Sequence, residues 1–337
     1  MPRLPQARGP VSERLLEALR GEPNALDPVA VESEAPLTDE DLQLSLYVAY
    51  ELTYRSFEEV DPRWEWSPGL IALRLELESR FEEALKESIG SPDRVAVDPA
   101  EMDVALRKVA NSDEAPSLSQ YVERHADLDQ IREFVIHRSA YQLKEADPHT
   151  LAIPRMFGPP KAALVEVQAD EYGGGRPERV HAQLFADVMD ALDLDSAYGA
   201  YLDRIPAVTL ATVNLISLFG LNRRLLGAIV GHLALFEMTS SVPNRRYGDG
   251  LRRIGYDGGA TEFFDEHVLA DAVHENVAAV DLAGGLARQR PGLGSQILWG
   301  ARALVFCEDR WATHLLHAWE AGRSSLLEQP AAQTLAS

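Results

Sequence analysis

Apolar residues recur every three or four positions along most of the chain, which is the spacing of one face of an α-helix. No stretch of comparable length alternates apolar and polar residues between hairpin-turn signals, as half-buried β-strands do. The sequence therefore predicts an all-α fold. The expected helices cover, by residue number, 12–19, 38–57, 70–88, 102–109, 118–146, 160–171, 175–193, 195–203, 206–220, 223–240, 246–254, 260–283 and 294–322.

The same pattern divides the chain into four parts. Residues 1–36 are rich in Pro, Gly and acidic residues, and we expect them to be mostly disordered. Residues 37–116 predict an accessory helical extension, which begins at a sequence resembling a capping box, Thr38-Asp39-Glu40-Asp41. Residues 117–322 form the expected helical core, and residues 323–337 are expected to be a frayed tail.

The most apolar region runs from Ile205 to Met238 and is interrupted by Asn222-Arg223-Arg224. Neither half is long enough to span a membrane, so two buried helices are the better interpretation. The N-terminus has no continuous apolar segment before a small-residue cleavage site, and we therefore expect no secretory signal.

Composition narrows the possible functions. The formal net charge of −21 would repel a nucleic acid, so we expect no DNA or RNA partner. The single cysteine, Cys307, excludes an internal disulfide and any cysteine-rich metal centre. Histidine and carboxylate remain as metal ligands, and a reducing, cytoplasmic setting fits this composition.

One stretch places two imidazoles and a carboxylate on the same side of an expected helix. His267, Asp271 and His274 stand at positions i, i+4 and i+7, and at about 100° per residue they fall within roughly a 60° arc. Groups aligned in this way can bind a metal ion. A solvated polar stripe would give the same pattern, so the stretch alone leaves both interpretations open.

Two glutamates stand beside apolar residues. Glu237 lies in the segment LALFEM, where an unpaired buried carboxylate would be costly. A salt bridge to Arg245 or Arg246 is the other possibility, and we favour a ligand role. Glu145 comes just before Asp147-Pro148, where proline should end a helix, and by itself it is typical of an exposed acid at a helix end.

A further segment combines acids, glycines and a histidine. The consecutive glycines 173–175 cost about 1 kcal/mol each relative to alanine in a helix, so they predict a loosened or broken helix. His181 can act with Glu178, at the E-x-x-H spacing of carboxylate-bridged di-iron bundles. It can also act with Glu171, if the glycines reset the helical phase. A plain loop between two helices is the alternative.

Taken in order, these residues resemble the haem-oxygenase-like di-iron oxidases, often described as iron-containing redox enzymes. The likeness rests on four successive segments: Tyr141-Gln-Leu-Lys-Glu145-Ala-Asp-Pro-His149, then Asp170-Glu171-Tyr-Gly-Gly-Gly and the later His181, then Phe236-Glu237-Met238, then His267-x3-Asp271-x2-His274. It covers about residues 117–322 and leaves the N-terminal third outside.

The resemblance implies a haem-oxygenase-like seven-helix bundle that binds two irons. It assigns the metal ligands to Glu145, Glu171, His181, Glu237, His267, Asp271 and His274, with Glu178 as a rival of Glu171. It also implies that the ferrous ions use O2 as co-substrate to oxidise a small amine, amino-acid-like or fatty-acid-like molecule by N-oxygenation, desaturation or oxidative carbon–carbon cleavage. Oxygen donors with imidazole and no thiolate suit iron, and manganese is also possible.

Two other functions fit parts of the pattern. A haem-binding or haem-degrading protein of the same fold needs one axial histidine, and it leaves Glu237, Asp271 and the second histidine unexplained. A non-catalytic helical interaction protein would instead act through the N-terminal helices.

The substrate contacts are the least defined part of the sequence. Arg245, Arg246 and Tyr247 follow the Glu237 helix, and Arg245 with Tyr247 could hold a substrate carboxylate. A basic loop that faces solvent is the slightly preferred alternative. The apolar helix faces within residues 42–85 would suit a homodimer contact.

Overall fold

The structure is a computed structural model that describes the chain except for residues 24–25, 27–29, 93–96, 113–115 and 329–337, and except for the side chains of residues 270–273. The described residues form helices and turns with no strand among them, which confirms the predicted all-α class. The α-helices are α1 (Pro10–Leu19), α2 (Glu40–Glu51), α3 (Pro68–Ile89), α4 (Met102–Ala110), α5 (Leu118–Arg124), α6 (Leu128–Gln142), α7 (Asp147–Thr150), α8 (Gly158–Glu171), α9 (His181–Ala191), α10 (Ala207–Leu221), α11 (Leu226–Thr239), α12 (Ser241–Arg253), α13 (Glu262–Asn276), α14 (Gly285–Gln289) and α15 (Gly294–Glu320).

Shorter helical segments join them. A π-helical segment, η9 (Val277–Gly284), continues α13. The 3-10 segments are η1 (Pro62–Trp66), η2 (Pro99–Glu101), η3 (Ile153–Arg155), η4 (Gly173–Gly175), η5 (Pro177–Arg179), η6 (Leu202–Arg204), η7 (Arg223–Leu225), η8 (Gly258–Ala260) and η10 (Pro291–Leu293).

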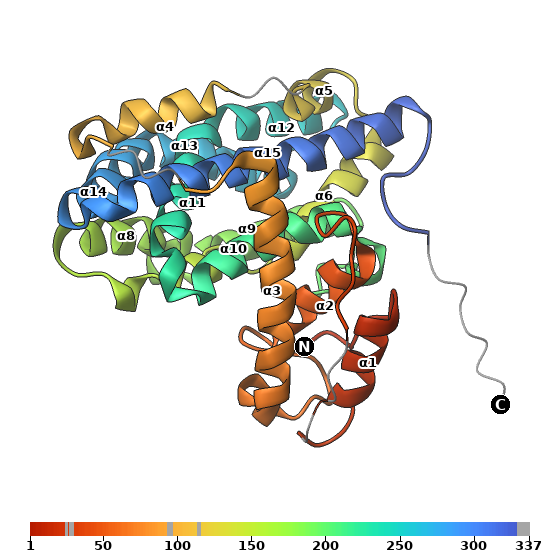
Figure 1. The fold of residues 1–337 in the computed structure, drawn as a ribbon. Helices are drawn as coiled ribbons and strands as arrows, with labels where there is room; N and C mark the ends of the chain where they lie inside the picture. Colours follow the sequence, from red (N-terminus) through yellow and green to blue (C-terminus); the bar gives the residue numbers. More distant parts are fainter. Residues whose placement is uncertain (24–25, 27–29, 93–96, 113–115, 329–337) are drawn as a thin grey trace.

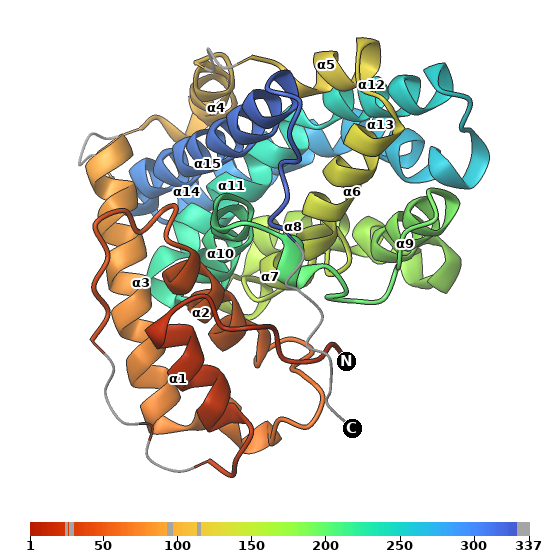
Figure 2. The same cartoon turned by 90° about the vertical axis from the view of Figure 1, so that its right-hand side faces the viewer.

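The core is built around α10, α11 and α15, whose sequences are the most apolar or the longest. Helix α11 lies along α15, and both contact α10. The N-terminal helices α1, α2 and α3 lie to one side of the remaining helices, as the red and orange ribbons show (Figures 1 and 2). They are nevertheless joined to the core, because α2 packs against α10 and α3 reaches α15.

Residues 1–36 are more ordered than the sequence predicts. Helix α1 buries Leu15, Leu16 and Leu19 in the same apolar core as α2 and α10. Its N-terminus is capped by Asp41 of α2, whose carboxylate accepts hydrogen bonds from the Val11 and Ser12 amides at 2.8 and 2.7 Å. A cap that comes from another helix leaves no local signature, and so the sequence indicated disorder. Within residues 1–36, residues 24–25 and 27–29 lie outside the described part of the chain.

Several predicted helix limits shift for local reasons. The expected helix over 118–146 divides at Asp127, whose side chain forms a capping box with Gln130 and begins α6. The helix expected over 175–193 begins only at His181, after the glycines. A helix was expected over 195–203. The structure has only the short η6 segment near the end of this range.

The expected frayed tail begins later than residue 323. Ser325 and Leu326 are buried. The Ser325 amide and hydroxyl both donate to Glu133 of α6, at 2.8 and 2.6 Å. The chain is thus held at least to this point, while residues 329–337 lie outside the described part.

The apolar faces within residues 42–85 are largely covered inside the chain. Leu42, Leu46, Leu70, Leu73 and Leu77 are all buried. These faces therefore do not support a homodimer contact. The homodimer itself stays a prediction. Among the described residues, no single helix is long and apolar enough to cross a membrane, although α10 joined to residues 223–239 across a 101° bend would pass by length and composition.

We expect His137 to make the fold acid-sensitive. Its Nδ1 lies 2.7 Å from Thr209 Oγ1 and its Nε2 lies 3.0 Å from Ser325 Oγ, and burial lowers its pKa well below 6.5. Only the unfolded chain therefore takes up this proton below pH 6.5, so the contribution of His137 to stability is complete above pH 6.5 and declines as the pH falls.

Urea unfolding at pH 7.0 and pH 5.5 measures this effect. The wild type should lose about 1 kcal/mol more than His137→Gln over this interval. His125→Gln is the control because His125 is exposed, and it should keep the wild-type pH dependence. An equal pH dependence in all three proteins would contradict the prediction.

Candidate metal centre

The candidate ligands come from five separate parts of the fold. Glu145 lies in the turn between α6 and α7, Glu171 is the last residue of α8, and His181 is the first residue of α9. Glu237 lies in α11, while His267 and His274 lie in α13. All six side chains are buried, with exposed fractions between 2 and 8%. Asp271 belongs to α13, but its side chain lies outside the described part of the structure.

Four of these side chains form a first group, made of Glu145, Glu171, His181 and His267, whose ligand atoms lie within 4.8 Å of one another. His181 Nδ1 is 3.0 Å from Glu171 Oε2 and 4.0 Å from Glu145 Oε2. His267 Nε2 is 3.7 Å from Glu145 Oε1. These distances leave space for one ion between the four side chains.

A second group consists of Glu171, Glu237 and His274, again within 4.8 Å of one another. His274 Nδ1 lies 3.4 Å from Glu237 Oε2. Glu171 belongs to both groups, so its carboxylate stands between two possible cation positions.

The glycine segment explains how Glu171 and His181 meet although ten residues separate them. Gly173, Gly174 and Gly175 all have positive φ, at 66°, 60° and 80°, which glycine adopts without steric cost. A Cβ at Gly173 would lie 2.6 Å from the carbonyl carbon of Arg179. This close approach turns the chain back at once, and it places the start of α9 beside the end of α8.

The charges of the site compensate one another. Burial alone would raise the pKa of Glu171, but His181, and less strongly His267 and His274, hold it at about 2. The close contact with Glu237 raises the pKa of His274 to about 9, against the effect of burial. Burial lowers the pKa of His181, yet Glu171 outweighs burial and raises it overall. The carboxylates of the site thus favour a positive charge at His181 and His274, which is the sign of charge that a metal ion would also supply.

The donor set fits a metal ion better than it fits a hydrogen-bond network. Glu145 Oε2, Glu171 Oε2, His181 Nδ1 and His274 Nδ1 are fully buried and make no well-aligned hydrogen bond. Buried polar atoms rarely lack a hydrogen-bond partner. Several such atoms that converge on one point are a sign of an ion site. Carboxylate and imidazole donors without thiolate suit iron or manganese.

Two contacts orient the histidines of α13. His267 Nδ1 lies 2.8 Å from the Phe263 carbonyl oxygen, which can accept its proton and leaves Nε2 directed at Glu145. Asp170 Oδ2 lies 3.0 Å from His274 Nε2 and leaves Nδ1 directed at Glu237. Such contacts fix the ring and tautomer of metal-binding histidines. Asp170 is part of the segment on which the family resemblance rests, but no role was predicted for it.

The structure also locates the two less certain residues. Glu178 lies in η5, exposed, and belongs to neither group of converging ligands. Arg245 is exposed on α12 and does not line a cavity beside the site, whereas Tyr247 is buried and does line one. The alternative salt bridge from Glu237 to Arg245 is not found among the ion pairs of the described residues.

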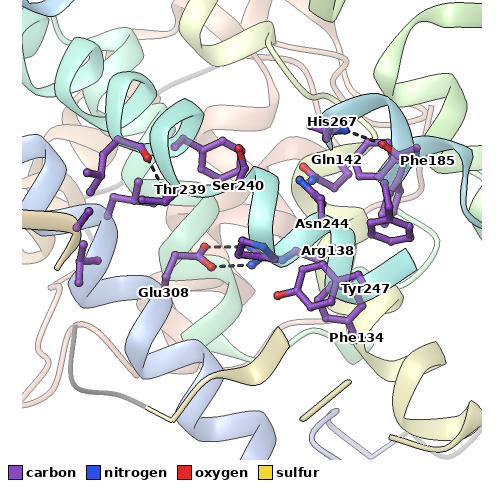
Figure 3. A pocket seen from close by; sticks show the side chains of 18 residues that line it. Phe134, Arg138, Gln142, Phe185, Thr239, Ser240, Asn244, Tyr247, His267 and Glu308 are labelled. Carbon is purple, nitrogen blue, oxygen red and sulfur yellow. Dashed lines mark hydrogen bonds and ion pairs between the residues drawn. The ribbon is translucent and has the colours of Figure 1, made fainter. Parts of the chain in front are cut away.

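This cavity has a volume of about 210 Å³ and adjoins the candidate metal centre. It shares Phe236, Ser240 and His267 with the small space among Glu145, Glu171 and Glu237. Figure 3 shows aromatic rings along its wall and His267 at one side. The remaining lining is Ala110, Phe134, Arg138, Gln142, Phe185, Leu235, Thr239, Pro243, Asn244, Tyr247, Phe263, Phe264, Leu304, Val305 and Glu308.

A charged pair also lines this cavity, among both aromatic and polar side chains. Arg138 Nη1 and Nη2 donate to the two carboxylate oxygens of Glu308 at 3.0 and 2.6 Å (Figure 3). The Arg138 guanidinium also lies 3.8 Å over the Trp311 ring. This pair was not predicted from the sequence. One signal could have singled out Arg138, because it stands seven residues before the candidate ligand Glu145, a spacing that places two residues on one helix face.

Comparison with known proteins agrees with the donor set. A family model described as iron-containing redox enzyme matches residues 132–309, slightly more than half of the chain. The nitrosourea synthase of Streptomyces achromogenes subsp. streptozoticus is 30% identical over 138 residues, which cover 40% of this chain and 29% of that relative. The chain thus spans less than a third of the length of the curated relative that it matches.

We expect the two rival acids to behave differently on substitution. Because Glu171 belongs to both groups of converging side chains, Glu171→Gln should weaken binding at both positions, by about 100-fold or more. Glu178→Gln should leave it unchanged, because Glu178 is exposed. Anaerobic Fe²⁺ titration of each variant measures the effect. Loss of iron in Glu178→Gln, with retention in Glu171→Gln, would assign the ligand to Glu178 instead.

Proposed function

Because this chain belongs to the family of iron-containing redox enzymes and is therefore an oxidoreductase, we propose that it is a non-haem di-iron oxidase that uses O2. One observation carries the proposal: two groups of buried carboxylates and imidazoles share Glu171. A haem protein needs a single axial histidine, and it would give no role to this convergence. Membership of an enzyme family argues against a non-catalytic interaction protein.

In this proposal one iron is held by the first group, Glu145, Glu171, His181 and His267. The second iron is held by Glu171, Glu237 and His274, with Asp271 as a further ligand from the sequence resemblance. Manganese suits the same donors. When bound, the two ferrous ions would supply the electrons for activation of dioxygen.

Three buried side chains beside the candidate ligands stay uncharged at pH 7. Burial, followed by the charges of Glu145 and Glu171, raises the pKa of Tyr141 well above 10, so its phenol stays protonated beside the ligands. His149 Nε2 lies 3.2 Å from His232 Nδ1. Burial lowers the pKa of His149 to about 4, so this pair is neutral at pH 7 and shares one proton between the two nitrogens.

The aromatic cavity is the proposed substrate site, because it meets the ligand set at His267. Phe134, Phe263 and Phe264 would hold the apolar part of a substrate. Tyr247 also lines this cavity and stays a proposed substrate contact. Arg138 takes the role that the sequence gave to Arg245. Since Arg138 is already paired with Glu308, a fatty carboxylate would have to compete with Glu308 for the guanidinium. An amine can pair with Glu308, and an amino-acid-like substrate can pair with both Arg138 and Glu308, so these substrates are favoured over a fatty acid.

Metal content provides the first test. Anaerobic titration of metal-free protein with Fe²⁺ should saturate near two equivalents per chain, and the loaded protein should consume O2. Asp271→Ala should lower the iron content while circular dichroism shows an intact helical fold, because a ligand is lost and not core packing. Saturation at one equivalent or none, or a Soret band on titration with haem, would contradict the proposal.

The substrate site has a separate test. Ferrous-loaded protein is screened for faster O2 consumption with amines, amino acids and fatty acids. For the compound that responds, Arg138→Lys should raise KM by roughly 10-fold or more, because the bidentate fork is lost. Arg245→Lys is the matched control and should keep the wild-type KM, because Arg245 lies outside the cavity. Equal effects of the two variants would exclude this role for Arg138.

A further inference from the structure

An ion pair that is fully buried lies beside the candidate metal centre. Lys144 Nζ donates to Glu51 Oε2 at 2.7 Å, and the exposed fractions of the two side chains are 1 and 0%. Glu51 lies at the end of α2, in the N-terminal part of the chain that the family match does not include. The pair therefore joins the N-terminal helices to the residue that directly precedes Glu145.

Both charges of this pair have further partners. The Tyr198 hydroxyl donates to Glu51 Oε1 at 2.6 Å. The Lys144 ammonium lies 4.7 Å from the centre of the Tyr47 ring and 4.6 Å from that of Tyr54. The ammonium is thus enclosed by one carboxylate and two aromatic faces, which fixes its position closely.

The turn that contains Lys144 also carries Glu145 and is tightly constrained. Ala146 has a φ of 72°, in the left-handed region that alanine rarely adopts. The Lys144 amide donates to the Tyr141 carbonyl at 2.8 Å, and the Asp147 amide donates to the Lys144 carbonyl at 3.2 Å. A residue held in this backbone conformation needs surrounding contacts that maintain it.

A second contact holds the other side of the same turn. The Tyr172 hydroxyl donates to Asp147 Oδ1 at 2.9 Å, and Tyr172 directly follows Glu171. The turn that carries Glu145 is therefore held from α2 through Lys144 and from the end of α8 through Asp147. Both contacts lie next to a candidate ligand in the sequence.

A buried ion pair is a poor means of stabilising a fold, since an apolar pair of similar volume often does as well. Its value is geometric, because a charge in the interior accepts few alternative positions. We propose that Glu51 and Lys144 are positioning residues that hold the Glu145 carboxylate in the metal centre. The N-terminal helix α2 is then part of the metal-binding machinery and not an independent accessory. This inference rests on the proposed di-iron function.

The test replaces the pair by neutral groups of similar size. In Glu51→Gln with Lys144→Met, the amide oxygen still accepts from Tyr198 and both charges are removed together. The control is Glu82→Gln with Arg224→Met, because the buried Glu82 of α3 forms a bidentate pair with the half-exposed Arg224, at 2.9 and 2.6 Å, and neither residue adjoins a candidate ligand in the sequence. Each protein is titrated anaerobically with Fe²⁺, and its thermal unfolding and amide hydrogen exchange are measured without metal.

The Glu51/Lys144 double variant should keep a wild-type melting temperature. It should bind one of its two irons about 10- to 100-fold more weakly, which is the usual effect of residues that orient ligands. Amides 144–147 should exchange faster than in the wild type, and the Glu82/Arg224 variant should match the wild type in both iron affinity and exchange.

If the double variant does not fold, Tyr198→Phe tests the same contact, because it removes one hydrogen bond from Glu51 and leaves the charges paired. A smaller loss of iron affinity in the same direction is expected. Wild-type affinity in the variants, or an equal loss in the Glu82/Arg224 control, would overturn the inference alone. A wild-type chain that binds no iron would overturn the proposed function and the inference together.

Discussion

The structure depends on how charge is compensated in its interior. Glu145, Glu171 and Glu237 are buried among helices whose other inward residues are mostly apolar. Taking a carboxylate out of water is costly unless an opposite charge lies close by. The imidazoles of His181, His267 and His274 supply this compensation. Helices α8, α9, α11 and α13 therefore converge at the point where these acids and histidines contact one another. The same charge compensation that lowers the cost of burying these carboxylates also brings the candidate ligands together.

Two other pairs of inward charges are compensated by fixed partners. Lys144 faces Glu51 in a fully buried pair, and Arg138 faces Glu308 in a partly buried pair. These pairs have fully formed hydrogen bonds, while the donor atoms around Glu171 lie close together without well-aligned ones. The contrast separates a structural ion pair from the cluster that we propose as the metal centre. It also shows why burial alone is not a guide to function in this chain.

Much of the helical order could be read from the sequence, because the period of apolar residues is local information. His267 and His274 could be singled out for the same reason, since they share one helix face. Glu145 resembled an exposed acid at a helix end, and Glu171 could not be separated from Glu178 by spacing, so only the order of the segments along the chain connected the two ligands. The Arg138–Glu308 pair joins positions 170 residues apart, and the cap of α1 comes from Asp41. Contacts of this kind exist only after folding and leave no periodic trace.

The two helix ends at the centre have opposite electrostatic character. Glu171 is the last residue of α8, a helix of 14 residues, and its C-terminal carbonyls carry a partial negative charge of about half an elementary charge. His181 is the first residue of α9, where the amide end carries a similar positive charge. The end of α8 attracts a cation, while the start of α9 opposes the protonation of His181 that Glu171 favours. The two helix ends thus act in opposite directions on any cation in the centre, so the net attraction for a positive charge comes from the side-chain carboxylates of Glu145, Glu171 and Glu237.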